Sequence, residues 1–154
     1  MNKKAPVRIA TIVQSPRLDV VSVVKEMAGV EGEFLECGVL DGLSTPEIEK
    51  LAPEKAQHML GARLSDKSHG HLARDKIIGK MQECIDRLVE QGADLVIVLC
   101  VGEWPKFRSK QLVVTPSESL CGFALGLARE GYKLGLILPA ENQIDDFKGK
   151  YSKD

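Results

Sequence analysis

The sequence predicts an α/β fold in which helices cover both faces of a parallel β-sheet. Several short runs are almost uniformly apolar and rich in β-branched residues, as in strands that are buried on both faces. These runs alternate with segments in which apolar residues recur every three or four positions, the spacing of an amphipathic helix. The connections between them are short, and this alternation is typical of an α/β sandwich.

The first half of the chain is expected to contain three strands and two helices. The first strand is β-branched and ends before Ser15-Pro16, and Gly29 ends the helix that follows. Pro46 stands where a first helical turn accepts proline. In order, the expected elements are a strand at Val7–Val13, a helix at Asp19–Met27, a strand at Glu33–Leu40, a short helix opened by Ser44-Thr45-Pro46-Glu47, a strand at Met59–Leu64 and a polar loop at Ser65–Gly70.

The second half contains the clearest helix and the most apolar strand. Ile77, Met81 and Ile85 fall on one helical face, and Gly92 ends that helix. The expected elements are a helix at about His71–Gln91, a strand at Ala93–Cys100, an extended piece at Leu112–Thr115, a helix at Ser117–Arg129, a strand at Leu134–Leu138 and a helix at Asn142–Tyr151. The loop 103–111 is the expected passage between two lobes, at 1–106 and 107–154.

Composition narrows the classes of partner. The 154 residues are 44% hydrophobic and 28% charged, with a net charge of −1, so no general attraction to nucleic acid or to an anionic membrane is expected. The longest apolar run, Leu95–Val101, is too short to span a bilayer. The basic N-terminal segment 1–17 reads as a first strand and not as a signal peptide. Four widely spaced cysteines without a CxxC motif indicate reduced thiols in a cytoplasmic protein.

Polar and reactive side chains follow the ends of the predicted strands. In open parallel sheets, ligands bind at the carboxyl ends of the strands, so these residues are expected to share one edge. Arginine binds carboxylate or phosphate through its planar fork, and the set therefore suits a small anionic ligand. The candidate site residues are Gln14, Ser15, Arg17, Asp41, Arg63, Cys100, Val101, Gly102, Glu103 and Gln143.

Cys100 is the candidate catalytic residue. A thiol at a strand end, with backbone N–H groups beyond it, can have a lowered pKa and act as a base or nucleophile. The alternative is that Cys100 is a small buried hydrophobe, the interpretation preferred for Cys37, Cys84 and Cys121. Glu103 either orients a ligand, raises the pKa of the thiol by repulsion, or is a solvated loop residue.

Three other site classes fit less well. Cysteine phosphatases place an arginine six positions after the cysteine, whereas Arg108 comes eight positions after Cys100. His58, His69 and His71 lack a cysteine or an acidic pair at metal-ligand spacing, which favours a solvated loop and no metal. No GxGxxG or Walker loop is present, which argues against a nucleotide cofactor.

The chain resembles the AroM family over almost all of 7–151. The resemblance is carried by "IVQSPRLDV", "CGVLDGLSTPEIEKLAP", "LGARLSD", "LVEQGADLVIVLCVGEWPKF", "LVVTPSESL" and "KLGLILPAENQ". AroM proteins look like distant relatives of the aspartate/glutamate/hydantoin racemase superfamily. That resemblance implies two flavodoxin-like lobes, of which this chain holds the first and part of the second, and chemistry without a cofactor. In the superfamily, one thiol from each lobe faces a small acid.

By position, the resemblance makes Cys100 the thiol of the first lobe. It implies that Gln14, Ser15 and Arg17 help to hold the substrate carboxylate, and it places Gln143 in a "P…Q" pattern. Val101 stands where the family usually has threonine. Family members normally continue into a second strand with its own cysteine, so the facing thiol is expected to be missing here, or to come from a partner subunit of a homodimer.

Three functions follow as hypotheses. The first is a cofactor-independent racemase, isomerase or decarboxylase that acts on a small carboxylic acid through Cys100. Backbone N–H groups near Val101 and Gly102 would then stabilise the enediolate-like charge. The second is a binding or regulatory module that keeps the anion pocket without catalysis, which the absent threonine and facing thiol favour. The third is a non-functional fragment of a longer enzyme.

Overall fold

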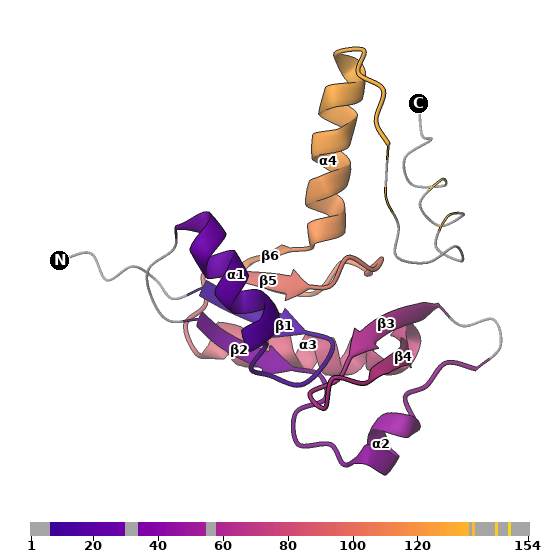
Figure 1. Ribbon diagram of the computed structural model, residues 1–154. Coiled ribbons are helices and arrows are strands. Elements are labelled where there is room, and N and C mark those ends of the chain that lie inside the picture. The colour runs from indigo at the N-terminus through magenta and orange to yellow at the C-terminus, as the bar shows by residue number, and fades with distance from the viewer. Residues whose placement is uncertain are drawn as a thin grey trace.

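The computed structural model describes residues 7–29, 34–54, 58–135, 137, 144 and 148. It is an α/β structure with a four-stranded parallel sheet in the order β2-β1-β5-β6 and a separate antiparallel pair, β3-β4 (Figure 1). The elements are β1 (Val7–Thr11), α1 (Leu18–Ala28), β2 (Phe34–Gly38), α2 (Thr45–Glu49), β3 (Met59–Arg63), β4 (His69–Ala73), α3 (Arg74–Glu90), β5 (Leu95–Leu99), β6 (Leu112–Val114) and α4 (Pro116–Arg129).

The parallel sheet brings the ends of β1 and β5 together. Strand β1 pairs in parallel with both neighbours, so Ile9 lies opposite Glu36 of β2 and Ile97 of β5. Thr11 and Leu99, the last residues of the two strands, are paired. The predicted α/β class with a parallel sheet is therefore confirmed, and the segments after β1 and β5 leave from one edge.

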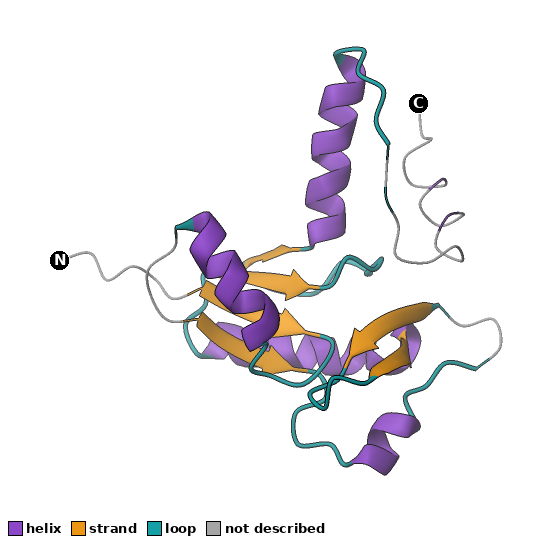
Figure 2. Ribbon diagram, in the orientation of Figure 1, coloured by secondary structure: helices purple, strands orange, loops and turns teal. Residues whose placement is uncertain are grey.

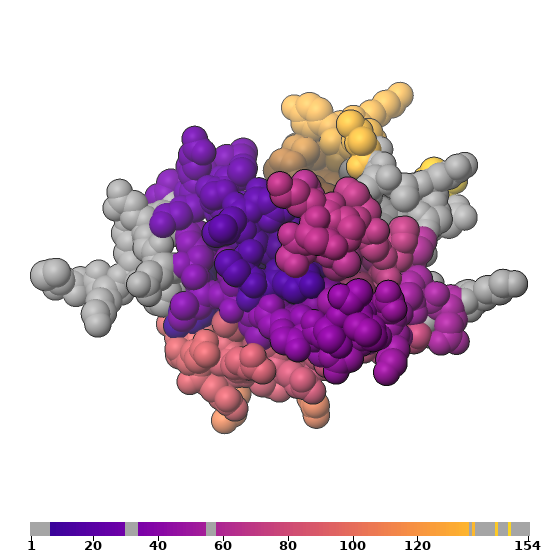
Figure 3. All heavy atoms as spheres, turned by 60° about the horizontal axis from the view of Figure 1, so that its bottom comes forward, coloured from indigo at the N-terminus to yellow at the C-terminus, as the bar shows by residue number. Residues whose placement is uncertain are grey.

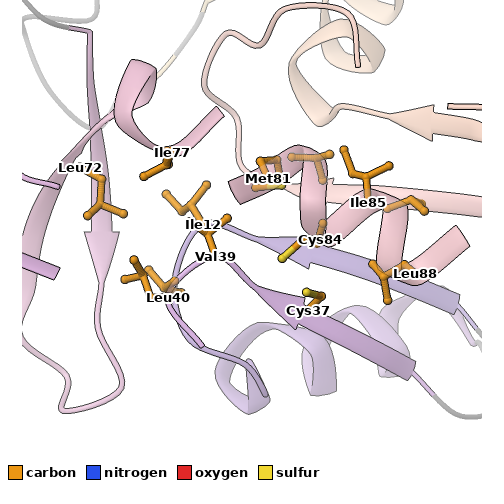
Figure 4. Packing of buried hydrophobic residues seen from close by; sticks show 14 of the residues in the cluster. Ile12, Cys37, Val39, Leu40, Leu72, Ile77, Met81, Cys84, Ile85 and Leu88 are labelled. Carbon is orange, nitrogen blue, oxygen red and sulfur yellow. The ribbon is translucent and has the colours of Figure 1, made fainter. Parts of the chain in front are cut away.

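Helix α3 covers one face of the sheet and forms most of the core. Its side chains Ile77, Met81 and Ile85 are fully buried against the sheet. Figure 4 shows them facing Cys37, which is in β2, and Val39, which directly follows β2. Burying a side chain of this size contributes about 1.5–3 kcal/mol to folding, so this layer fixes the sheet edge that carries the site.

Helix α1 lies on the opposite side of the sheet from α3 (Figure 1). It buries Val21, while α4 buries Ala124. Both helices leave large apolar side chains exposed, including Met27 at 83% and Phe123 at 67%. Helix α4 begins directly after β6 and projects away from the sheet in the same view. The apolar α3 face is therefore the principal packed layer within the described ranges.

The segment 59–73 differs from the sequence prediction. Met59–Leu64 was expected beside the other strands and 65–70 as a loop before a helix from His71, but β3 and β4 form an antiparallel hairpin apart from the main sheet (Figure 2). Leu60, Ala62 and Leu72 are buried and alternate with exposed residues, so the pattern has the period of a strand. The turn uses Asp66, whose carboxylate accepts the Ser68 N–H at 2.9 Å, and α3 begins at Arg74.

The region after 106 holds further differences. Strand β6 pairs with β5 in the same sheet as β1, and the division into lobes at 106/107 stays a prediction. Leu134, Gly135 and Ile137 do not form the expected strand, and 136 and 138 lie outside the described residues. Of the expected helix at 142–151, the described residues Ile144 and Lys148 are helical. Among the described helices, none is long and apolar enough to cross a membrane.

Candidate functional site

A cavity of about 700 Å³ opens at the carboxyl edge of β1 and β5, between that edge and the β3–β4 hairpin. Six of the predicted site residues line it: Arg17, Arg63, Cys100, Val101, Gly102 and Glu103. They come from the segment after β1, the end of β3 and the segment after β5. The hairpin also contacts the β1–α1 connection directly, since the Ser65 N–H donates to Gln14 Oε1 at 3.3 Å, and its magenta atoms lie against the indigo N-terminal segment in Figure 3.

Cys100 is placed by a tight turn at the end of β5. The Cys100 N–H donates to the Val98 carbonyl at 2.8 Å, which bends the chain directly after the strand. The Gly102 N–H then donates to Cys100 Sγ at 3.4 Å. Gly102 has no room for a side chain, because a Cβ there would clash with Leu60 and lie 3.4 Å from the sulfur. The hairpin and the Cys100 turn are therefore in close contact.

The protonation of Cys100 differs from the sequence prediction of a lowered pKa. Burial raises the pKa of the Cys100 thiol, and the Gly102 N–H and the nearby Trp104 indole counteract this only in part. Trp104 Nε1 is buried and makes no hydrogen bond to the described residues, so its N–H acts on the sulfur through proximity. Glu103 is not a cause of the shift. The resting group is a neutral thiol, which can donate a proton but is a poor nucleophile.

Alkylation of Cys100 by iodoacetamide is expected to be slower at pH 7 than alkylation of the same residue in the urea-unfolded chain. The reagent attacks the thiolate, and a raised pKa lowers the thiolate fraction at neutral pH. The rate should rise about tenfold per pH unit and reach its plateau at a higher pH than in the unfolded chain. Peptide mapping by mass spectrometry measures the rate at Cys100 itself. A plateau at lower pH in the folded chain would contradict this assignment.

The two predicted arginines of the cavity differ in their partners. Arg17 donates from Nε and Nη2 to the Asp19 carboxylate at 2.9 and 3.0 Å, and its backbone N–H donates to Glu36. The backbone of Arg63 pairs with His69 in the hairpin, but its side chain makes no hydrogen bond or ion pair with the residues that the structure describes. Both guanidinium groups lower the pKa of Asp19, Arg17 chiefly through its hydrogen bonds and Arg63 through its charge alone. Arg63 is therefore the cation of the cavity that is available to a ligand.

Three predicted ligand-binding residues instead build the turn beneath the cavity, and a fourth is not described. Asp41 accepts hydrogen bonds from the Ser15 N–H at 2.7 Å, the Ser15 hydroxyl at 2.6 Å and the Gly38 N–H at 2.7 Å. Gln14 accepts from Ser65. None of Gln14, Ser15 and Asp41 is among the described residues that line the cavity. Gln143 lies outside the described residues.

The sequence analysis did not assign the three histidines to the site. His58, His69 and His71 all line the cavity, as does Arg74. The expected solvated loop is in fact strand β4 for two of them, and the strand's alternation points His69 and His71 to one face. The sequence signal that could have indicated them is the spacing of His69 and His71, which are two residues apart and therefore share one face of a strand. Among the described lining residues, Glu103 is the one acidic side chain, so the cavity has an excess of cationic and imidazole groups.

The remaining cysteines lie away from the cavity. Cys37 and Cys84 are buried, with 3% and 4% of their surface exposed, and both belong to the hydrophobic core shown in Figure 4. Burial raises the pKa of the Cys84 thiol, and its contact with Cys37 adds to this. Cys121 is half-buried on α4. In the described part of the chain, no three His, Cys, Asp or Glu side chains gather so that they could hold a metal ion.

The comparisons with known proteins give one finding. The family model described as AroM protein matches residues 7–154, which include every element of the sheet and all residues of the cavity. No curated protein and no solved structure matches the chain. Since the family model spans nearly the whole sequence, the chain belongs to the AroM family.

Proposed function

We propose that this AroM protein binds a small carboxylic acid in the Cys100 cavity and transfers a proton to it from the Cys100 thiol, without a cofactor. The observation that carries the proposal is that the unpaired Arg63 guanidinium and the Cys100 sulfur line the same cavity. A guanidinium binds a carboxylate through two parallel N–H donors, which would fix the acid beside the sulfur. A cavity of about 700 Å³ is large enough for a small organic acid.

The chemistry follows from the neutral thiol. The small fraction of Cys100 that is ionised removes a proton from the carbon next to the bound carboxylate, so a C–H bond breaks, the neutral thiol forms and the negative charge spreads over the acid as an enediolate. After the thiol has exchanged its proton with water, the same carbon takes a proton back from Cys100 Sγ–H. A C–H bond forms, the S–H bond breaks, and the negative charge passes to sulfur. The Gly102 N–H, which already donates to Sγ at 3.4 Å, stabilises the thiolate in that state. The thiolate that begins the cycle is thereby restored, so proton and charge balance over the cycle.

The alternative function is a small-anion-binding or regulatory module without catalysis. Burial of Cys100 favours it, because a raised pKa leaves only a small fraction of the group as thiolate at neutral pH, and only the thiolate can act as a base. Val101 favours it as well, because its side chain supplies no hydroxyl to a ligand. Both functions require the same binding step, and they differ in whether a proton moves.

Two measurements test the proposal. Acetate, propionate, succinate and glutarate are added in turn, and the alkylation rate of Cys100 is measured at pH 9 in a Cys121→Ser background. At least one acid is expected to protect Cys100. Incubation of that acid in D₂O should then give deuterium at the carbon next to the carboxylate, detected by proton NMR, and Cys100→Ser should abolish the exchange. Protection without exchange supports the binding module, and a lack of protection by any of the acids contradicts both.

A further inference from the structure

The outward face of the β3–β4 hairpin carries a cluster that the proton-transfer step does not use. Antiparallel pairing places His71 directly opposite Gly61 and His69 directly opposite Arg63. Directly paired residues point to the same face, so these four share one side of the hairpin. All four line the Cys100 cavity. The hairpin therefore presents two adjacent pairs to the same space, one with a guanidinium and one with a glycine.

Gly61 has no side chain on this face, and the open space over it, beside His71, is called the notch below. A Cβ atom built at Gly61 would have no neighbouring atom within 4 Å, and its φ angle is not in the left-handed region. Neither the backbone conformation nor crowding therefore calls for a glycine at this position. Its effect is to leave open space beside His71. Along the strand, Arg63 is two residues from Gly61, so the notch and the Arg63 backbone are about 7 Å apart.

The groups around the notch are hydrogen-bond donors suited to an anion. His71 offers an imidazole N–H in either protonation state. Arg74, which begins α3 just after β4, also lines the cavity, but its Nε and Nη2 both donate to Asp75 at 3.3 Å, so its charge is partly offset. Glu103, the one acidic residue among the described lining residues, belongs to the segment after β5 and not to the hairpin. The notch therefore has the His71 imidazole as a donor beside it and no acidic lining residue on the described hairpin.

We infer that the notch over Gly61 is a second anion subsite, so that the ligand carries two anionic groups. One carboxylate lies on Arg63 beside Cys100, as the proposed function requires, and the second group lies in the notch against His71. A short-chain dicarboxylic acid has the two groups at a suitable separation, and a phosphorylated carboxylic acid presents the same chemistry. The inference rests on the proposed function, because it assumes that the first carboxylate binds at Arg63.

The test compares the affinities of ligands with one and two anionic groups, in the wild-type protein and in variants that fill the notch or remove the His71 imidazole. Kd is measured by calorimetry for propionate, succinate, glutarate and 2-phosphoglycolate with the wild-type protein, Gly61→Ala, Gly61→Val and His71→Ala. The wild type is expected to bind at least one of the dianions about 10- to 100-fold more tightly than propionate. Gly61→Val and His71→Ala should remove most of that preference and change the Kd of propionate less than twofold. Whether a dicarboxylate or the phosphate ester binds best identifies the second group.

A matched control separates filling of the notch from a general effect of the substitution. Gly79 on α3 also has open space around its Cβ position but lies outside the cavity, so Gly79→Ala should leave all Kd values unchanged. Equal affinity for mono- and dianions would overturn the second subsite, as would equal weakening of propionate and dianions in Gly61→Val. In either case the proposed function stands if propionate still protects Cys100. Failure of all four acids to bind or protect would contradict the proposed function itself.

Discussion

Arg63→Gln is expected to weaken the binding of small carboxylic acids by about 100-fold, because each hydrogen bond to a charged group contributes about 1.5–3 kcal/mol and a guanidinium makes two of them. The Arg63 side chain lines the cavity and makes no hydrogen bond or ion pair within the described chain, so its N–H donors are available to a ligand. Glutamine keeps one amide donor and a similar length but removes the charge. Calorimetry or the thermal shift with the best protecting acid measures the effect.

Two further variants give this prediction its controls. Arg17→Gln is expected to have a smaller effect than Arg63→Gln, because the Arg17 charge is already offset by Asp19 through bonds of 2.9 and 3.0 Å. Arg108→Gln removes an arginine outside the cavity and should leave Kd unchanged. If Arg17→Gln weakens binding strongly while Arg63→Gln has no effect, the carboxylate binds at the end of β1 and the assignment of Arg63 is wrong.

Asp41→Ala is expected to lower the free energy of unfolding by about 2–4 kcal/mol, because it removes three hydrogen bonds to one carboxylate. Two of the donors are the backbone N–H groups of Ser15 and Gly38, which no other described side chain replaces. The third is the Ser15 hydroxyl, at 2.6 Å. This carboxylate ties the end of β2 to the segment after β1, so the loss affects the edge on which the cavity is built. Urea unfolding measures the change.

Less drastic substitutions rank the three bonds. Asp41→Asn keeps one carbonyl oxygen as an acceptor and should lose less stability than Asp41→Ala. Ser15→Ala removes the hydroxyl alone and should cost about 1 kcal/mol. Gly38→Ala should be severe as well, since its Cβ would lie 2.5 Å from Asp41 Oδ1 and 2.6 Å from Ser15 N. An Asp41→Ala loss no larger than that of Ser15→Ala would show that water replaces the carboxylate at both backbone donors.

The parallel sheet could be predicted from the sequence because its strands are continuous apolar runs. Val7–Thr11 is buried along almost its whole length, whereas Leu95–Leu99 alternates between buried and more exposed residues, and both are recognised by their continuous apolar, β-branched sequence. Strand β3 was expected, as Met59–Leu64, whereas its antiparallel partner β4 was expected as the end of a polar loop and the start of a helix. In β4, Leu72 and Ala73 are both buried and His69 and His71 are exposed, so its five residues have no clear period of two.

Six of the predicted site residues line one cavity at the expected edge of the sheet, and their catalytic and ligand-binding roles stay predictions. The positions of Arg63 and Cys100 follow from strand ends, which the sequence reveals. The hydrogen bonds between Glu36 and the Arg17 backbone and between Asp41 and Ser15 do not, because these acids lie 19 and 26 positions away in the sequence and approach only in the folded chain. The sign of the Cys100 pKa shift was wrong for a related reason. Backbone N–H donors can be inferred from position along the chain, whereas the burial that outweighs them depends on tertiary packing.

The most direct test of the account is a crystal structure of the protein grown with the small carboxylic acid that best protects Cys100. The account predicts a carboxylate within hydrogen-bond distance of the Arg63 guanidinium, with the neighbouring carbon facing Cys100 Sγ. The acid bound at another surface, with the Arg63 guanidinium and the Cys100 cavity free of it at a saturating concentration, would contradict the account.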